Sequence, residues 1–164
     1  MRIVPLLALL SVTTTVAAAD EHELVEFQTL SPDTAVAIAR GALATCRDRG
    51  FQVAVAVVDR MGVPQAMIRD RYAGAHTPDT ATRKAWTAVS FREDTLALSE
   101  NTGPDSAQAG ARQIANALML GGGVPVEVAG SVVGGVGISG APTGADDHAC
   151  ALAGIDAVKA DLEF

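Results

Sequence analysis

The sequence predicts an α+β fold, within the broad α/β class, in which one antiparallel sheet carries packed helices. Short runs of strand-forming residues are joined by tight turns, and segments of helical periodicity stand before, between and after these runs. The chain has 164 residues, of which 49% are hydrophobic and 19% are charged. These values are typical of one compact globular domain.

The N-terminus has the pattern of a secretory signal peptide. A positive start at Arg2 is followed by the almost wholly apolar stretch 3–10 and by small residues before Asp20. The apolar stretch is shorter than the roughly 20 residues that a membrane-spanning helix needs. We therefore expect cleavage near Ala19 and a soluble mature protein in the periplasm or outside the cell. A buried N-terminal helix is the alternative interpretation.

This expectation divides the chain into three parts. Residues 1–19 form the signal peptide, residues 20–30 a flexible polar lead-in, and residues 31–164 a single domain. The first helix of the domain is expected to begin after Ser31, a residue type that caps helix N-termini, and to end at Gly50.

A hairpin of two strands is expected next. Residues 53–58 form an apolar run rich in β-branched side chains, as in a strand that is covered on both faces. A tight turn at 59–62 leads to a partner strand at 63–69. After a loop at 72–76, the second helix is expected to start with Thr77 as its N-cap.

The second half of the chain is predicted to contain two short helices, three strands and a long last helix. A turn signal separates the short helices, and glycines interrupt the strands. The predicted ranges are 94–98 and 105–116 for the short helices, 118–120, 124–128 and 131–139 for the strands, and about 146–162 for the last helix.

Charge and composition exclude nucleic acid as the main partner. The formal net charge is −7, and a field of that sign repels phosphate backbones. Aromatic residues make up 4% of the chain, so platforms on which bases stack are scarce. The two cysteines, Cys46 and Cys150, lie on the first and last predicted helices. A disulfide between them and two buried free thiols are both compatible with the sequence.

Three short motifs favour structural over functional interpretations. The G-x-G-x-x-G pattern at 135–140 lies within a strand and lacks the context of a dinucleotide site, so we expect its glycines to let a helix or a neighbouring subunit approach the sheet. Ser139 lacks the partners of a hydrolase triad. The acids at 146–147, next to His148, are expected to cap the last helix rather than to bind a metal.

The loop before the second helix carries the best candidate for a ligand site. His76 lies at the mouth of that helix, where exposed N–H groups and the helix dipole attract an anionic group. The same potential disfavours imidazolium, so a neutral ring is available to a metal. A haem offers both an iron and acidic propionates. Tyr72 is a second candidate ligand, and Arg71, Arg83 and Lys84 are candidates to pair with propionates. A plain surface hydrogen-bonding role for His76 is the alternative.

Five blocks of sequence resemble the haem-binding GlcG/HbpS-like family, which is related to the C-terminal domain of PduO proteins. They occur in the family's order and span nearly the whole predicted domain. The blocks are the loop and helix at 73–88, the hairpin residues 57–59 with Gly62, the segment 121–125, the segment 133–140, and Asp147 with Cys150, Ala151 and Gly154.

The resemblance implies a profilin-like fold, with a five-stranded antiparallel sheet and helices on both faces. It also implies homo-oligomers and, in some members, binding of haem or a related tetrapyrrole. Thr77 matches a threonine that is assigned near the haem iron in the family, and His76 stands at a variable position that often carries histidine. His148 departs from the family, in which an acid often follows the residue equivalent to Asp147.

Together, these observations predict an exported haem-binding protein. We expect His76 to be the axial ligand of the haem iron, Thr77 to support it, Tyr72 to make a second contact, and Arg83 and Lys84 to help hold the cofactor. The resemblance further implies an accessory role in haem uptake or sensing, through a membrane sensor protein.

Two other functions stay open at this point. The first is an enzyme that degrades haem or acts on a small hydroxy acid, which would need an acid–base pair from Asp59, Asp146 and Asp147. The second is a non-catalytic interaction module for a membrane sensor. We expect the absence of catalysis rather than its presence.

Overall fold

The structure, a computed structural model, describes residues 25–162 of the chain. The predicted signal peptide and the first residues of the predicted lead-in lie outside these described residues. Within the described range, no helix is both long and apolar enough to cross a membrane.

The described part of the chain contains one antiparallel sheet of four strands, in the order β2-β1-β4-β3. The central strands β1 and β4 pair along β1, with Ala54 opposite Ser139. The strands are β1 (Ala54–Asp59), β2 (Pro64–Arg69), β3 (Gly123–Val128) and β4 (Ser131–Ser139). The predicted hairpins are therefore confirmed.

The prediction of a fifth strand is wrong for the described residues, because the predicted strand at 118–120 does not join the sheet. The backbone N–H of Leu118 donates to the Thr87 hydroxyl at 2.9 Å rather than to a neighbouring strand. Met119 is buried against Leu98 in a small apolar cluster outside the sheet. A side-chain acceptor and a local cluster thus replace strand pairing here.

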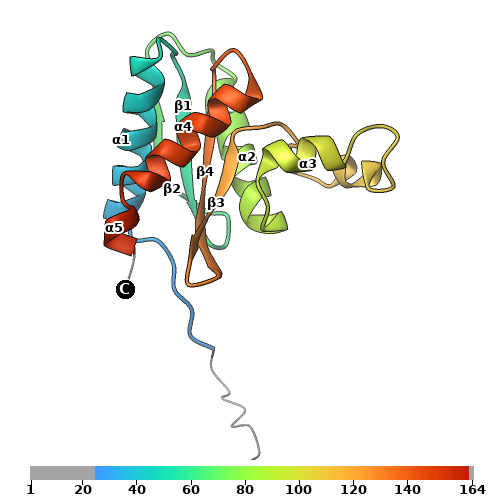
Figure 1. The fold of residues 1–164 in the computed structure, drawn as a ribbon, viewed down its shortest axis with the longest axis horizontal. Coiled ribbons are helices and arrows are strands. Elements are labelled where there is room, and N and C mark those ends of the chain that lie inside the picture. Colours follow the sequence, from blue (N-terminus) through green and yellow to red (C-terminus); the bar gives the residue numbers. More distant parts are fainter. Residues whose placement is uncertain (1–24, 163–164) are drawn as a thin grey trace, which may run out of the picture.

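Helices cover both faces of the sheet, as predicted (Figure 1). Because strand side chains alternate, Val55 and Val57 face the main core beneath α1 (Pro32–Asp48) and α4 (Gly144–Asp156). Ala54 and Ala56 face the opposite helix α2 (Thr77–Phe91). The apolar run of β1 is thus explained by burial on both faces.

The glycines of β4 allow α2 to lie directly on the sheet. A Cβ at Gly137 would stand 1.9 Å from the carbonyl oxygen of Ala81, and one at Gly135 would stand 3.0 Å from that of Ala85. The structural interpretation of the G-x-G-x-x-G pattern, as a place where a helix approaches the sheet, is confirmed.

The first and last predicted helices differ in how well their ends were predicted. Ser31 caps α1, since its hydroxyl accepts from the N–H of Thr34, and Gly50 follows the helix with a φ of +81°. The last helix begins earlier than expected and is divided into α4 and the short α5 (Lys159–Leu162). Between the two pieces, Val158 is buried in the core.

The segment between α2 and β3 projects from the body as an arm (Figure 1). It begins with α3 (Thr95–Asn101), which is capped by Asp94. The predicted helix at 105–116 is wrong, because only a short 3₁₀ helix, η1 (Ala109–Gln113), forms there. None of its residues is buried, so no apolar face stabilises a longer helix.

Cys46 and Cys150 form a disulfide between α1 and α4, with their Cα atoms 5.6 Å apart. Both residues are fully buried. The structure thereby decides between the two alternatives that the sequence left open. The flexibility of the lead-in stays a prediction, although its last residue, Leu30, is buried in the core and its N–H donates to the carbonyl of Val133.

Candidate functional site

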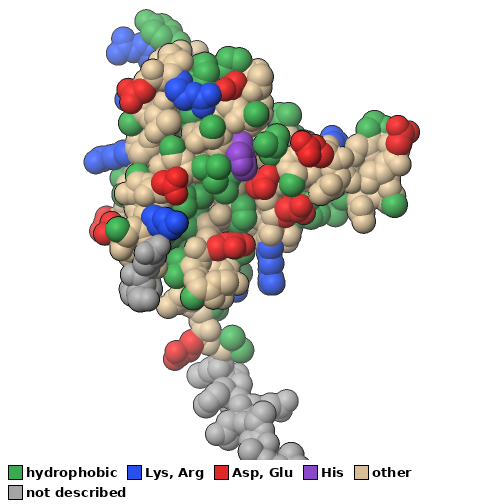
Figure 2. Space-filling model, in the orientation of Figure 1, with side chains coloured by type: hydrophobic (Ala, Val, Ile, Leu, Met, Phe, Trp, Pro, Cys, Tyr) green, Lys and Arg blue, Asp and Glu red, His purple; other side chains and the backbone are tan. Residues whose placement is uncertain are grey.

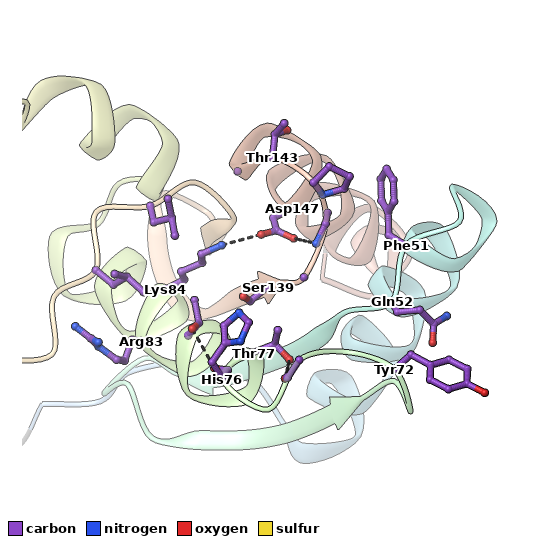
Figure 3. A pocket seen from close by; sticks show the side chains of 18 of the residues that line it. Phe51, Gln52, Tyr72, His76, Thr77, Arg83, Lys84, Ser139, Thr143 and Asp147 are labelled. Carbon is purple, nitrogen blue, oxygen red and sulfur yellow. Dashed lines mark hydrogen bonds and ion pairs between the residues drawn. The ribbon is translucent and has the colours of Figure 1, made fainter.

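An open cavity of about 760 Å³ lies at the end of β4, between the first turns of α2 and α4. Its volume falls within the range of roughly 300–1,000 Å³ that is typical of small-molecule sites. The loop before α2 supplies one wall, and the loop between β4 and α4 supplies another (Figure 3). Five of its lining residues are site residues that the sequence predicted: Tyr72, His76, Thr77, Arg83 and Lys84.

His76 is the residue directly before α2, and its side chain is exposed at the cavity. It occupies the N-cap position that was predicted for Thr77, but its side chain makes no capping bond. The ring lies over Gly74, where an added Cβ would be 2.7 Å from the ring Cε1 atom. Within residues 25–162, the ring makes no hydrogen bond, so its nitrogens are available to a ligand.

Thr77 lies beside His76 but is almost fully buried, at 1% exposure. Its hydroxyl donates to the carbonyl of Gly74 at 2.8 Å, and its N–H donates to the same oxygen at 3.0 Å. These two bonds tighten the loop that presents the imidazole. The hydroxyl oxygen retains its capacity as an acceptor, and Thr77 is one of the residues that line the cavity.

Tyr72 lies at the outer rim rather than within the cavity. Its side chain is 78% exposed, and Figure 3 shows the ring pointing away from His76. The guanidinium of Arg71 stands 5.9 Å from the centre of this ring, and Arg71 itself does not line the cavity. A contact between Tyr72 and a bound ligand would require the side chain to turn inward.

The two predicted cations of α2 have different surroundings. Arg83 reaches the base of the arm, where its guanidinium donates to the carbonyls of Ala117 and Asn116 at 3.1 and 3.4 Å. Lys84 is 1% exposed, and its ammonium donates to the carbonyl of Ile138 at 2.9 Å and to Asp147 at 2.8 Å. The charge of Lys84 is therefore already balanced by a buried partner.

Asp147 is the acidic member of this buried pair, on the first turn of α4. Its second carboxylate oxygen accepts from the N–H of Ala141 at 3.0 Å. Burial raises the pKa of Asp147, while the charge of Lys84 and the two hydrogen bonds oppose that shift. The pair joins α2 to α4 across the end of β4.

The other acid–base candidates lie elsewhere. Asp59 accepts the N–H groups of Met61 and Val63 in the β1–β2 turn. Asp146 pairs with Arg49 at 2.5 Å on the surface. Of the three acids named from sequence, only Asp147 lines the cavity.

The helix cap at the last helix also differs from the prediction. Thr143, rather than an acid, caps α4, since its hydroxyl accepts from the N–H of Asp146. Across the described residues there is no cluster of three or more potential metal ligands, and His148 stands 4.0 Å from Asp94 on the α3 side.

Sequence reasoning missed the wall formed by residues 139–144. Ser139 ends β4 and is 5% exposed, and the loop that follows it leads directly into α4. A strand that ends in Ser-Gly, followed three residues later by a Thr N-cap, was the available signal. Only the tertiary structure shows that this loop faces His76.

The fold and the cavity define a class: an α+β domain with a four-stranded antiparallel sheet between helices and an open cavity at one sheet end. The model of one family, described as haem degrading protein HbpS-like, matches residues 30–156. Since this match covers most of the chain, the protein belongs to the HbpS-like family.

Solved structures agree with this assignment. A double mutant of HbpS from Streptomyces reticuli is 37% identical, with a TM-score of 0.77 over 88% of this chain and 97% of that chain. ORFY of Klebsiella pneumoniae is 25% identical, with a TM-score of 0.82 over 87% and 99% of the two chains. The structure of a PduOC:haem complex is 28% identical, with a TM-score of 0.73 over 79% and 94%. A comparison with curated protein sequences gives no match.

Proposed function

We propose that the protein binds haem, or a related tetrapyrrole, in the cavity at the end of β4. The observation that carries the proposal is the His76 ring, which is exposed at the cavity and makes no hydrogen bond among the described residues. A similar solved structure is a haem complex, and the family description names haem. His76 would be the axial ligand of the iron.

The residues present fit such a group. The cavity has the volume of a small-molecule site, and its charged lining consists of Arg83, Lys84 and Asp147. Two cations against one carboxylate favour a ligand with acidic arms in an otherwise acidic protein. Haem supplies an iron that accepts an imidazole nitrogen. Thr77 holds the loop of His76 in place, and Arg83 stands at the wall where it can meet an acidic arm.

Titration with haemin tests this proposal directly. We expect purified protein to shift the Soret band of haemin, and His76→Ala to lose most of the shift because the iron loses its ligand. His148→Ala is the matched control, since His148 does not line the cavity. Equal binding by wild type and His76→Ala would contradict the assignment of His76, and no shift with wild type would contradict haem binding itself.

Haem degradation is a second candidate, because the family description includes it. Among the acids proposed from sequence, the cavity contains Asp147 alone, and that residue is committed to Lys84. We therefore favour binding without turnover. Incubation of the haem-loaded protein with a reductant separates the two: a stable Soret band supports binding alone, and progressive bleaching beyond that of free haemin supports degradation.

We further propose that residues 1–19 direct export and that the mature, homo-oligomeric protein serves haem uptake or sensing outside the cytoplasm, through a membrane sensor. The buried Cys46–Cys150 disulfide supports an oxidising compartment. Fractionation of expressing cells, with mass determination of the N-terminus, is expected to find the chain starting near Asp20 in the periplasm or medium. A full-length chain confined to the cytoplasm would contradict this proposal.

A further inference from the structure

We infer that Ser139 and Lys84 form a carboxylate-binding subsite on the floor of the cavity. This inference rests on the proposed function, since it concerns the same cavity, but it names the ligand group that the floor would hold. Ser139 has no role in the site described above, and Lys84 contributes there only its charge.

Ser139 is a buried polar group that no other group in residues 25–162 satisfies. The residue is 5% exposed, no hydrogen bond of its hydroxyl is found among the described residues, and it lines the cavity. The hydroxyl oxygen is not one of the fully buried atoms without a partner, so it stays accessible from the cavity. A hydroxyl that opens on a cavity and has no protein partner can bond to water there, and a ligand atom that takes the place of this water keeps the bond.

The strand register shows where the hydroxyl faces. Ser139 lies two residues after Gly137 on β4, so both residues belong to the face that α2 covers. Gly137 lies beneath Ala81, and Ser139 therefore lies toward the first turn of α2, where that helix opens on the cavity. Figure 3 shows Ser139 between the His76 ring and the Lys84–Asp147 pair in this view.

Lys84 brings a second donor to the same place. Its ammonium has three N–H donors, of which two are used by Ile138 and Asp147. Ile138 precedes Ser139 in the chain, so the ammonium is bound directly beside the serine. Lys84 lines the cavity, and its third donor has no hydrogen-bond partner among the described residues.

The carboxylate of Asp147, which also lines this part of the cavity, already accepts hydrogen bonds within the protein. One oxygen of Asp147 accepts from Lys84 and the other accepts from the N–H of Ala141. The floor therefore offers donors, from a hydroxyl and an ammonium, without a competing free carboxylate. The starts of α2 and α4 add their positive potential on the same cavity. This combination fits a group that is negative and accepts hydrogen bonds, which is a carboxylate.

Two sources can provide that carboxylate: a propionate arm of a haem, or a free small carboxylic acid. The first comparison uses haemin and haemin dimethyl ester, whose acidic arms are blocked. For wild type we expect haemin to bind at least about 10-fold more tightly than the ester, because a charge-assisted hydrogen bond is lost. Ser139→Ala should reduce this ratio toward one. Ser131→Ala, an exposed serine at the other end of β4, is the matched control.

The second comparison uses sodium propionate against sodium chloride at equal ionic strength, without haem. If a free acid is the source, propionate raises the melting temperature of wild type and of Ser131→Ala but not that of Ser139→Ala. Circular dichroism of each variant confirms that it is folded before binding is compared.

The outcomes separate the subsite from the proposed function. Haemin binding that is equal to ester binding, with no propionate effect, overturns the subsite and leaves haem binding intact. No binding of haemin or its ester, together with a propionate effect that Ser139→Ala abolishes, supports the subsite and overturns haem binding. A preference for haemin over its ester, or a propionate effect, that Ser139→Ala leaves unchanged overturns the role of Ser139.

Discussion

Lys84 and Asp147 form an ion pair that is almost completely excluded from water. The two side chains are 1% and 5% exposed, and their charged atoms are 2.8 Å apart. Removing one partner of such a pair leaves an uncompensated buried charge, whereas removing both can be nearly neutral. The pair therefore stabilises the contact between α2 and α4 only as long as it is complete.

Lys84→Met is expected to lower the free energy of unfolding by about 3–5 kcal/mol, because Asp147 is left buried without its cation. Urea unfolding followed by circular dichroism measures the loss. The double variant Lys84→Met, Asp147→Leu should be more stable than the single variant. A single variant as stable as wild type would show that water reaches the pair.

The pH dependence of Asp147 follows from its burial. Burial raises the pKa of this carboxyl above the ordinary value of 3.8. At a pH between 3.8, the pKa in the unfolded chain, and the higher pKa in the folded protein, the folded protein holds a proton that the unfolded chain has released. The stability contributed by Asp147 is therefore present below 3.8 and is lost as the pH rises through the folded pKa.

Carbon NMR of the side-chain carboxyls checks this expectation, with Asp147→Asn used to assign the signal. The midpoint of the Asp147 titration should lie above 3.8. A midpoint below that value would mean that the attraction of Lys84 outweighs the cost of burial, and the sign of the pH dependence would be reversed.

At the scale of single residues, the sequence predicted the position of His76 well and the surroundings of Lys84 poorly. The position of His76 follows from local signals, since a Thr-Pro-Asp run marks a helix start one residue later. The burial of Lys84 depends on Asp147, which is far away in sequence. A pattern within α2 contains no information about that partner.

At the scale of elements, the disulfide fastens α4 to α1. Cys150 stands one turn after Asp147 on α4, so the same helix carries the bridge and the acid of the cavity. Gly41 and Gly154 allow the two helices to approach, since a Cβ at Gly154 would be 2.8 Å from the carbonyl of Ile38. The wall of the cavity therefore depends on the α1–α4 contact.

Replacing both cysteines by alanine should lower the free energy of unfolding by about 2–5 kcal/mol, as is usual when a native disulfide is removed. Thermal unfolding of the double variant and of wild type, with and without a reductant, measures the effect. Once wild type has been unfolded in reductant and its disulfide is reduced, its thermal stability should approach that of the double variant. Identical stability of all samples would contradict the structural role of the bridge.

Two elements that were predicted correctly bury a regular apolar pattern, whereas the segment 105–116, which was predicted wrongly, buries none in its 3₁₀ helix. The strand at 53–58 and the first helix each present side chains to the core. The segments 105–116 and 118–120 lie in the arm, where η1 buries nothing and Leu118 binds a threonine side chain. Local propensity alone did not decide their structure.

At the scale of the whole molecule, the arm is the part with the least support from the core. It projects from the body in Figure 1, and its side chains gather in a small separate cluster around Leu98 and Met119. Figure 2 shows acidic side chains along the same projection. Segments with few buried contacts open more readily than central strands do.

Hydrogen exchange read by mass spectrometry is expected to show this difference. The amides of η1 should exchange at least about 100-fold faster than those of β1, since they open without global unfolding. Peptides from β3, an edge strand that follows the arm, provide the internal comparison. Equal protection of η1 and β1 in the isolated protein would show that another copy or ligand covers the arm.

The sequence by itself determined the alternation of helices and hairpins, the start of α1, the position of His76 and the family resemblance, because each depends on residues that are near one another in the chain. The tertiary structure alone decided the four-strand sheet, the disulfide, the buried Lys84–Asp147 pair and the place of Ser139 on the cavity floor. These features join segments that are distant in sequence. Their energies come from burial and pairing, which exist only after the helices have packed on the sheet.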